Sequence, residues 1–108
     1  MTTNKYGLRE LEKEFGALTF GRLLKSHRLG ENLSQTDLAK ILKISKQSLN
    51  DLENGRTFPS ISRAAAIARK IGVMEAMMVE LCIQGLIDRQ KLNLVVKIEE
   101  VKNRKRAS

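Results

Sequence analysis

The stretch SQTDLAKILKISKQSLNDLENG, from Ser34 to Gly55, contains two short helical patterns separated by only a few residues. Ser34 is a favourable N-cap, and Asp37 three residues later can accept from the cap and suits the positive end of the helix dipole. Ser45 opens the second helix in the same way, and the pair Asn54-Gly55 is a typical helix end. Two capped helices with so short a connection must cross at a steep angle.

The apolar residues of this stretch close the corner between the two helices. Ala39 is small where the helices approach each other, Ile44 fills the corner, and Leu49 faces inward. The first turn of the second helix, residues 45–48, then points away from the body of the protein. Because a helix is about 10 to 12 Å across and the major groove of B-DNA is roughly 12 Å wide, this helix can present side chains to base edges.

The flanking sequence predicts an all-α protein. Helical spacing of apolar residues recurs over 8–18, which predicts an N-terminal helical extension at residues 1–18, and again over 19–30. A central domain is predicted at 19–87 and a C-terminal strand with a basic end at 88–108. The last two helices of the central domain are expected to begin at Ser60 and near Met74. The expected inner face of the helix after Ser60 is Ile61, Ala64, Ala65, Ala68 and Ile71.

The pattern changes in residues 92–101, here called the C-terminal segment. Leu92, Leu94, Val96 and Ile98 alternate with other residues at a period of two, which predicts a β-strand. A helix with Leu94, Ile98 and Val101 on one face is the alternative. Since an unpaired strand edge is a liability, the strand would pair with a second copy across a two-fold axis or with a different protein. The basic residues 102–106 would contact phosphates or form a solvated end.

Composition and charge narrow the class of protein. The 108 residues are 42% hydrophobic and 30% charged, which is typical of a soluble globular domain. A single Cys allows no intrachain disulfide, no apolar run approaches the roughly 18 to 20 residues that span a bilayer, and the first residues do not form a signal peptide, so a cytoplasmic protein is expected. Twenty Lys and Arg against twelve Asp and Glu give a net charge of +8, which attracts polyanions such as nucleic acid.

Residues that would support catalysis are not found at informative spacings. The sequence has no recognisable set of nucleophile, base and orienting group, and no glycine-rich phosphate loop. One His and one Cys, His27 and Cys82, cannot build a zinc site. We therefore expect no enzymatic activity, no metal and no cofactor.

The corner motif resembles the DNA-binding domain of the phage repressor/Cro family, also called XRE-type. That family's pattern places Gln, then Ala, an apolar residue followed by Ser or Thr, and Glu-x-Gly at fixed offsets. Here these positions are held by Gln35, Ala39, Ile44, Ser45 and the run Glu53-Asn54-Gly55. The resemblance covers about residues 20–83 and implies a lambda-repressor-like five-helix bundle, with the helix-turn-helix at 34–42 and 45–54.

The turn position of the motif departs from the family. It is usually Gly, because the backbone there tends toward positive φ, and here it is Lys43. A non-Gly residue in that conformation costs about 1 kcal/mol, which a packed domain tolerates.

The resemblance also implies a function and a set of site residues. It implies a sequence-specific DNA-binding transcriptional repressor that binds a palindromic operator in double-stranded DNA as a homodimer. Gln can pair with adenine, Lys with guanine, and Asp with cytosine or against wrong sites. The residues expected at base edges are Lys46, Gln47 and Asp51, and those expected at phosphates are Ser34, Gln35, Asn54 and Arg56. The pair Arg28 and Glu53 matches a structural salt bridge of the family.

A second resemblance concerns the flanks. The stretches EFGALTFGRLLKSHR and GLIDRQKLNLVVKIE are similar to HigA-type antitoxins encoded beside RelE/HigB-like toxins. This implies an antitoxin of a type II toxin–antitoxin module that represses its own operon. The alternative is a stand-alone XRE-type regulator without a toxin partner. The residues expected to contact a second copy or a partner are Met74, Met77, Met78, Leu94, Val96 and Ile98.

Overall fold

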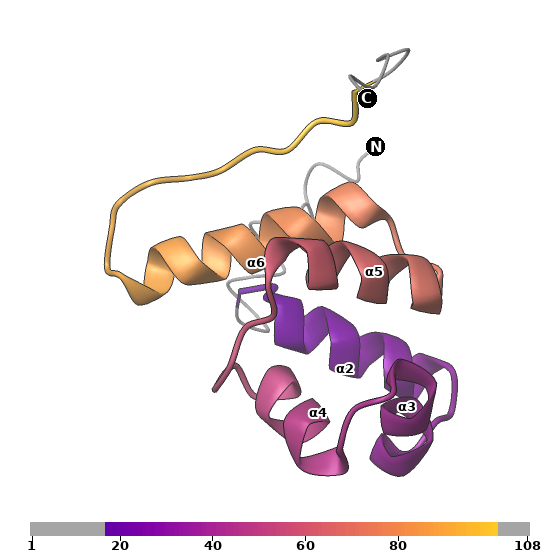
Figure 1. Ribbon diagram of the computed structural model, residues 1–108. Helices are drawn as coiled ribbons and strands as arrows, with labels where there is room; N and C mark the ends of the chain where they lie inside the picture. The colour runs from indigo at the N-terminus through magenta and orange to yellow at the C-terminus, as the bar shows by residue number, and fades with distance from the viewer. Residues whose placement is uncertain (1–16, 102–108) are drawn as a thin grey trace, which may run out of the picture.

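The computed structural model describes residues 17–101, and these form five α-helices and no strand. The helices are α2 (Phe20–Gly30), α3 (Gln35–Leu42), α4 (Lys46–Glu53), α5 (Ile61–Ile71) and α6 (Glu75–Arg89). Helices α5 and α6 pack together, α2 contacts both α4 and α6, and α3 and α4 form the end of the molecule away from α6 (Figure 1). The predicted all-α fold is confirmed. The N-terminal helix expected within 1–18 falls almost wholly outside the described residues, as do the basic residues 102–106.

Hydroxyl side chains set the starts of four of these helices. The cap hydroxyl accepts the backbone N–H three residues later in each case, at 3.0 or 3.1 Å. The capping residues of α2, α3, α4 and α5 are Thr19, Ser34, Ser45 and Ser60. The caps predicted at Ser34, Ser45 and Ser60 are therefore confirmed. No side-chain cap precedes α6.

The core gathers apolar side chains from all five helices. Its buried members are Phe20, Leu24, Leu38, Ala39, Leu42, Leu49, Leu52, Ala64, Ile67, Ala68, Met78 and Cys82. The predicted inner face of α5 is wrong at Ile61, which lies in the first turn and is 52% exposed. Ile67, which shares a face with Ala64 and Ala68, is buried instead. Within the described helices, none is long and apolar enough to cross a membrane.

Two glycines allow close approaches that a side chain would block. A Cβ atom at Gly21 of α2 would lie 2.4 Å from the carbonyl oxygen of Leu52 and 2.6 Å from that of Glu53. Helices α2 and α4 therefore meet backbone to backbone. In α6, a Cβ at Gly85 would lie 2.4 Å from the ring of Phe58, so this glycine makes room for the chain that links α4 to α5.

The predicted C-terminal strand is wrong for the single chain, and so is its helical alternative. The C-terminal segment is extended and runs back along α6 (Figure 1). The Leu92 N–H donates to the Ile87 carbonyl at 3.3 Å, and residues 93–101 make no backbone–backbone hydrogen bond among the described residues. Side chains of α6 bond to it instead. The Gln84 amide donates to the Leu94 carbonyl (2.9 Å) and accepts from the Val96 N–H (2.8 Å), and the Glu80 carboxylate accepts from the Ile98 N–H (2.9 Å).

Candidate nucleic-acid interface

The turn between α3 and α4 is closed by backbone hydrogen bonds. Lys43 has φ 58° and ψ 46°, so the left-handed conformation expected at this position is confirmed. The Lys43 N–H donates to the Lys40 carbonyl (3.2 Å), and the Ile44 N–H donates to the Ala39 carbonyl (3.0 Å). These bonds end α3 abruptly and let α4 start at Lys46.

A buried ion pair anchors the end of α4 to α2. Arg28 and Glu53 are 7% and 5% exposed. Arg28 Nε donates to Glu53 Oε2 at 2.7 Å and its Nη2 donates to Oε1 at 3.1 Å, so the pair is bidentate. The remaining Arg28 nitrogen donates to the Leu33 carbonyl at 3.0 Å. The hydrogen bond from Glu53 raises the pKa of Arg28. The pair predicted between these residues is confirmed.

Two residues expected at phosphates are held by neighbours within the motif. Gln35 Nε2 donates to Glu53 Oε1 at 3.0 Å, which ties the start of α3 to the same carboxylate. Asn54 Nδ2 donates to the side chain of Asn50 at 2.6 Å and to its carbonyl at 2.9 Å. Their phosphate contacts stay predictions, and a contact through either amide nitrogen requires it to share or exchange its present acceptor.

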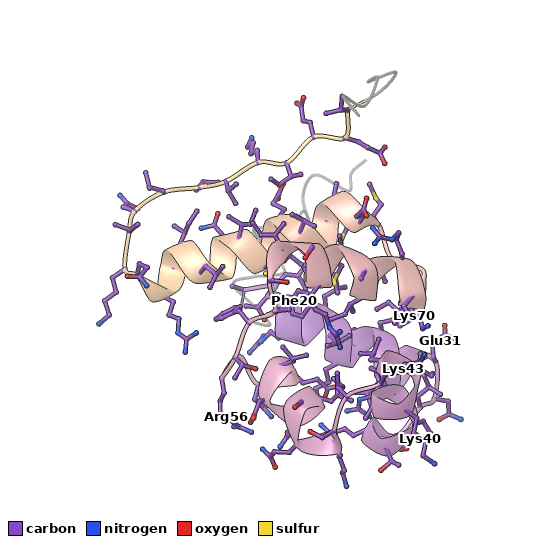
Figure 2. All side chains as sticks on the ribbon, viewed as in Figure 1. Phe20, Glu31, Lys40, Lys43, Arg56 and Lys70 are labelled. Atoms are coloured by element: carbon purple, nitrogen blue, oxygen red, sulfur yellow. The ribbon has the colours of Figure 1, made fainter. Side chains whose placement is uncertain are left out.

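The first turn of α4 is exposed at the end of the molecule away from α6 (Figure 1). Lys46 and Gln47 are both exposed there, while Leu49 in the next turn is fully buried. Two further exposed cations lie at the end of α3 that leads into this turn: Lys40 in the last turn of α3 and Lys43 at its C-cap (Figure 2). Sequence reasoning did not select these two lysines, although each lies outside the apolar stripe of α3.

Asp51 holds two neighbouring side chains with one oxygen atom. Its Oδ1 accepts from Gln47 Nε2 at 3.0 Å and from Arg56 Nε at 2.9 Å. The hydrogen bond from Arg56, helped by that from Gln47, lowers the pKa of Asp51, so this carboxylate is ionised at neutral pH. The Gln47 carbonyl oxygen, its second amide hydrogen and the two terminal nitrogens of Arg56 have no partner within the described part of the chain.

The methionine-rich face of α6 is narrower than predicted. Met74 and Met77 are 66% and 41% exposed and remain candidates for contact with a partner. Met78 is fully buried in the core, so its side chain is not available on the surface of the single chain.

Cys82 is also fully buried, donates to the Pro59 carbonyl, and has a pKa raised by burial. Residues 17–101 contain no group of three His, Cys, Asp or Glu side chains that could hold a metal ion.

Comparisons with known proteins agree with this geometry. A 10 kDa protein of the ImmF control region of Bacillus phage phi105 is 44% identical over 48 residues, which are 44% of this chain and 53% of the phage protein. An uncharacterized HTH-type transcriptional regulator of Methanocaldococcus jannaschii is 44% identical over 50 residues, 46% of this chain and 76% of the archaeal protein. No solved structure matches the chain significantly. A family model described as a helix-turn-helix domain matches residues 19–81, more than half of the chain, and the chain therefore belongs to the XRE-like helix-turn-helix family.

Proposed function

We propose that this protein is a sequence-specific DNA-binding transcriptional repressor that inserts the first turn of α4 into the major groove. The observation that carries the proposal is the exposure of Lys46 and Gln47 at the start of a helix whose other end is fixed by a buried ion pair. A helix held in this way can present side chains to base edges at little conformational cost. The net charge of +8 supports attraction to the phosphate backbone.

Four side chains in and just after the exposed turn have a role in this proposal: Lys46, Gln47, Asp51 and Arg56. Asp51 orients Gln47 through one amide hydrogen, and the Gln47 carbonyl and second amide hydrogen then form the donor and acceptor that adenine needs in the major groove. Lys46 is suited to the O6 and N7 atoms of guanine. Arg56 is held by the same Asp51 oxygen and directs its terminal nitrogens to phosphate. Asp51 thus positions Gln47 and Arg56, in addition to any contact that it makes with a base edge itself.

The names of the relatives support a regulatory role. One relative is a protein of a phage control region and the other is called a transcriptional regulator. Because a palindromic operator presents two equivalent half-sites, the proposal includes a homodimer.

The flanks support a more specific proposal, that this regulator is the antitoxin of a type II toxin–antitoxin module and represses its own operon. It rests on the likeness of the flanking stretches to HigA-type antitoxins, and a stand-alone regulator is the alternative. Co-expression with the product of the neighbouring reading frame distinguishes the two. The antitoxin proposal requires that this product arrest growth when expressed alone and form a complex with the protein, and a product without toxicity contradicts it.

DNA binding is tested by selecting duplexes from a random pool with the full chain and measuring their affinity. We expect Gln47→Ala to relax preference at one base pair, where a bidentate contact is worth about 1–3 kcal/mol. Lys46→Ala should also weaken selected duplexes more than random ones. Lys70→Ala removes the same charge from the exposed last turn of α5 and is the matched control, with little change expected. Failure to enrich any sequence, or an unchanged base preference in Gln47→Ala, would contradict the proposal.

A further inference from the structure

The C-terminal segment has one edge that is bonded to α6 at three backbone groups and one edge that is open. In an extended chain the N–H and C=O groups of one residue point to one side, and those of the next residue point to the opposite side. The side facing α6 is used, because Gln84 and Glu80 bond to the backbone of Leu94, Val96 and Ile98. The Gln84 amide, which donates to one of these groups and accepts from another, takes the place of a peptide group in a neighbouring strand.

The opposite edge is exposed. The backbone groups of Val95 and Lys97 point away from α6 and have no hydrogen-bond partner in the described part of the chain. The Val95 side chain is 80% exposed, more than any other large apolar side chain that the structure describes. The segment lies at the periphery of the molecule (Figure 1). An extended, apolar edge held open in this way is suited to strand pairing.

We propose that this edge pairs with the same edge of a second copy, forming a two-stranded antiparallel ribbon centred on Val95. In this register Val95 exchanges both backbone hydrogen bonds with Val95 of the second copy, and Asn93 and Lys97 exchange theirs across the axis. The helix α6 of each copy then covers the outer edge of the ribbon, so that no edge is left open.

A second copy is the expected partner because, in this register, apolar side chains of one segment lie opposite apolar side chains of the other. Leu92 lies opposite Ile98, and Leu94 lies opposite Val96, so each apolar residue of one face meets another. Leu92 and Leu94 are 51% and 59% exposed in the single chain and gain apolar neighbours in the ribbon.

The neighbouring two-fold registers match less well. Centring on Lys97 places this lysine opposite its own copy, and centring on Leu94 places Lys91 opposite Lys97. Like charges directly opposite are destabilising. Centring on Val96 or on Ile98 places an apolar residue opposite Glu100. The register centred on Val95 avoids both kinds of mismatch.

This surface would give the proposed repressor its dimer, but its test uses no DNA, so the two proposals can fail separately. Sedimentation of the full chain should show a dimer. Val95→Pro removes an N–H that faces outward, a position where an edge strand tolerates proline, and leaves the bonds to Gln84 and Glu80 in place. We expect this variant to weaken the dimer by at least about tenfold, because two intermolecular hydrogen bonds are lost by symmetry.

Val95→Ala, which keeps the N–H, is the matched control and should weaken the dimer much less. Circular dichroism checks that both variants retain their helices. A monomeric wild type, or a dimer that Val95→Pro leaves unchanged, would overturn the proposal, and so would a monomer that instead takes up a different protein at this edge.

Cross-linking tests the register. Directly opposed, hydrogen-bonded residues have Cα atoms about 5.5 Å apart, within the range that a disulfide spans. Val95→Cys should therefore form a linked dimer under mild oxidation, while Val101→Cys should not. Linking of a mixture of Val95→Cys and Val101→Cys, without linking of Val95→Cys alone, would place the axis at Ile98 and refute the register.

Discussion

Replacing Gly21 by Ala should separate α2 from α4 and destabilise the whole domain. The new Cβ would lie 2.4 and 2.6 Å from two backbone carbonyl oxygens at the end of α4, and backbone atoms cannot rotate away as a side chain can. The helices must therefore move apart, and a gap of roughly 0.5–1 Å already forfeits a quarter to a half of each dispersion contact across it. Overpacking of this kind costs about 1–3 kcal/mol.

The gain in helix propensity from Gly to Ala offsets up to about 1 kcal/mol of that cost. The same movement strains the Arg28–Glu53 pair, which joins the same two helices. We expect a net loss of about 2 kcal/mol, which corresponds to a fall in Tm of roughly 8–16 °C for a domain of this size.

The assay is urea and thermal unfolding followed by far-UV circular dichroism. Gly30→Ala is the matched control, because it is the same substitution in the same helix and its Cβ would meet no atom within 4 Å. We expect Gly30→Ala to leave the free energy of unfolding unchanged or to raise it by up to about 1 kcal/mol. Equal stability of the two variants would refute the close approach of α2 and α4.

Three further substitutions test other parts of the fold by unfolding measurements. Arg28→Met should lower the free energy of unfolding by about 3–5 kcal/mol, because it leaves the Glu53 carboxylate buried and unpaired. Adding Glu53→Leu should recover much of that loss, and a loss below about 1 kcal/mol for Arg28→Met alone would contradict the buried pair. Lys43→Gly should raise stability by up to about 1 kcal/mol because it relieves a left-handed backbone at φ 58°, and a lower Tm would count against that strain. Hydrogen bonds from the backbone and hydroxyl of Ser34 lower the pKa of Asp37, so the stability this carboxylate adds is present above its ordinary pKa and is lost as the pH falls through the lowered value. Asp37→Ala should therefore be less stable than the wild type at pH 7 and no different at a pH below that lowered value, and a pH-independent difference would refute the role of the charge.

Much of the fold could be predicted from the sequence because local chemistry determines it. Hydroxyl caps at fixed distances from apolar stripes locate the starts of α3, α4 and α5, and Gly72 ends α5 in the left-handed conformation. The buried pair of Arg28 and Glu53 could be predicted only through the resemblance to a family. These residues are 25 positions apart, and no local pattern connects them.

Other features depend on tertiary contacts that a periodicity does not contain. Gly21 looks like any helical glycine until α4 is placed against it. The C-terminal segment has the period of a strand, yet the bonded groups of its inner edge pair with Gln84 and Glu80 rather than with a second strand. The period of two correctly indicated an extended backbone, but it could not indicate that side chains of α6 would bond to that backbone.

The exposed first turn of α4 is the central claim, and NMR mapping of a selected duplex onto the full chain tests it most directly. Backbone amide signals of Ser45, Lys46, Gln47 and Ser48 should shift most, with smaller shifts at the start of α3 and at Arg56. The C-terminal segment should be unaffected in an already dimeric protein. Largest shifts on α5 or α6, with the first turn of α4 unchanged, would contradict the account.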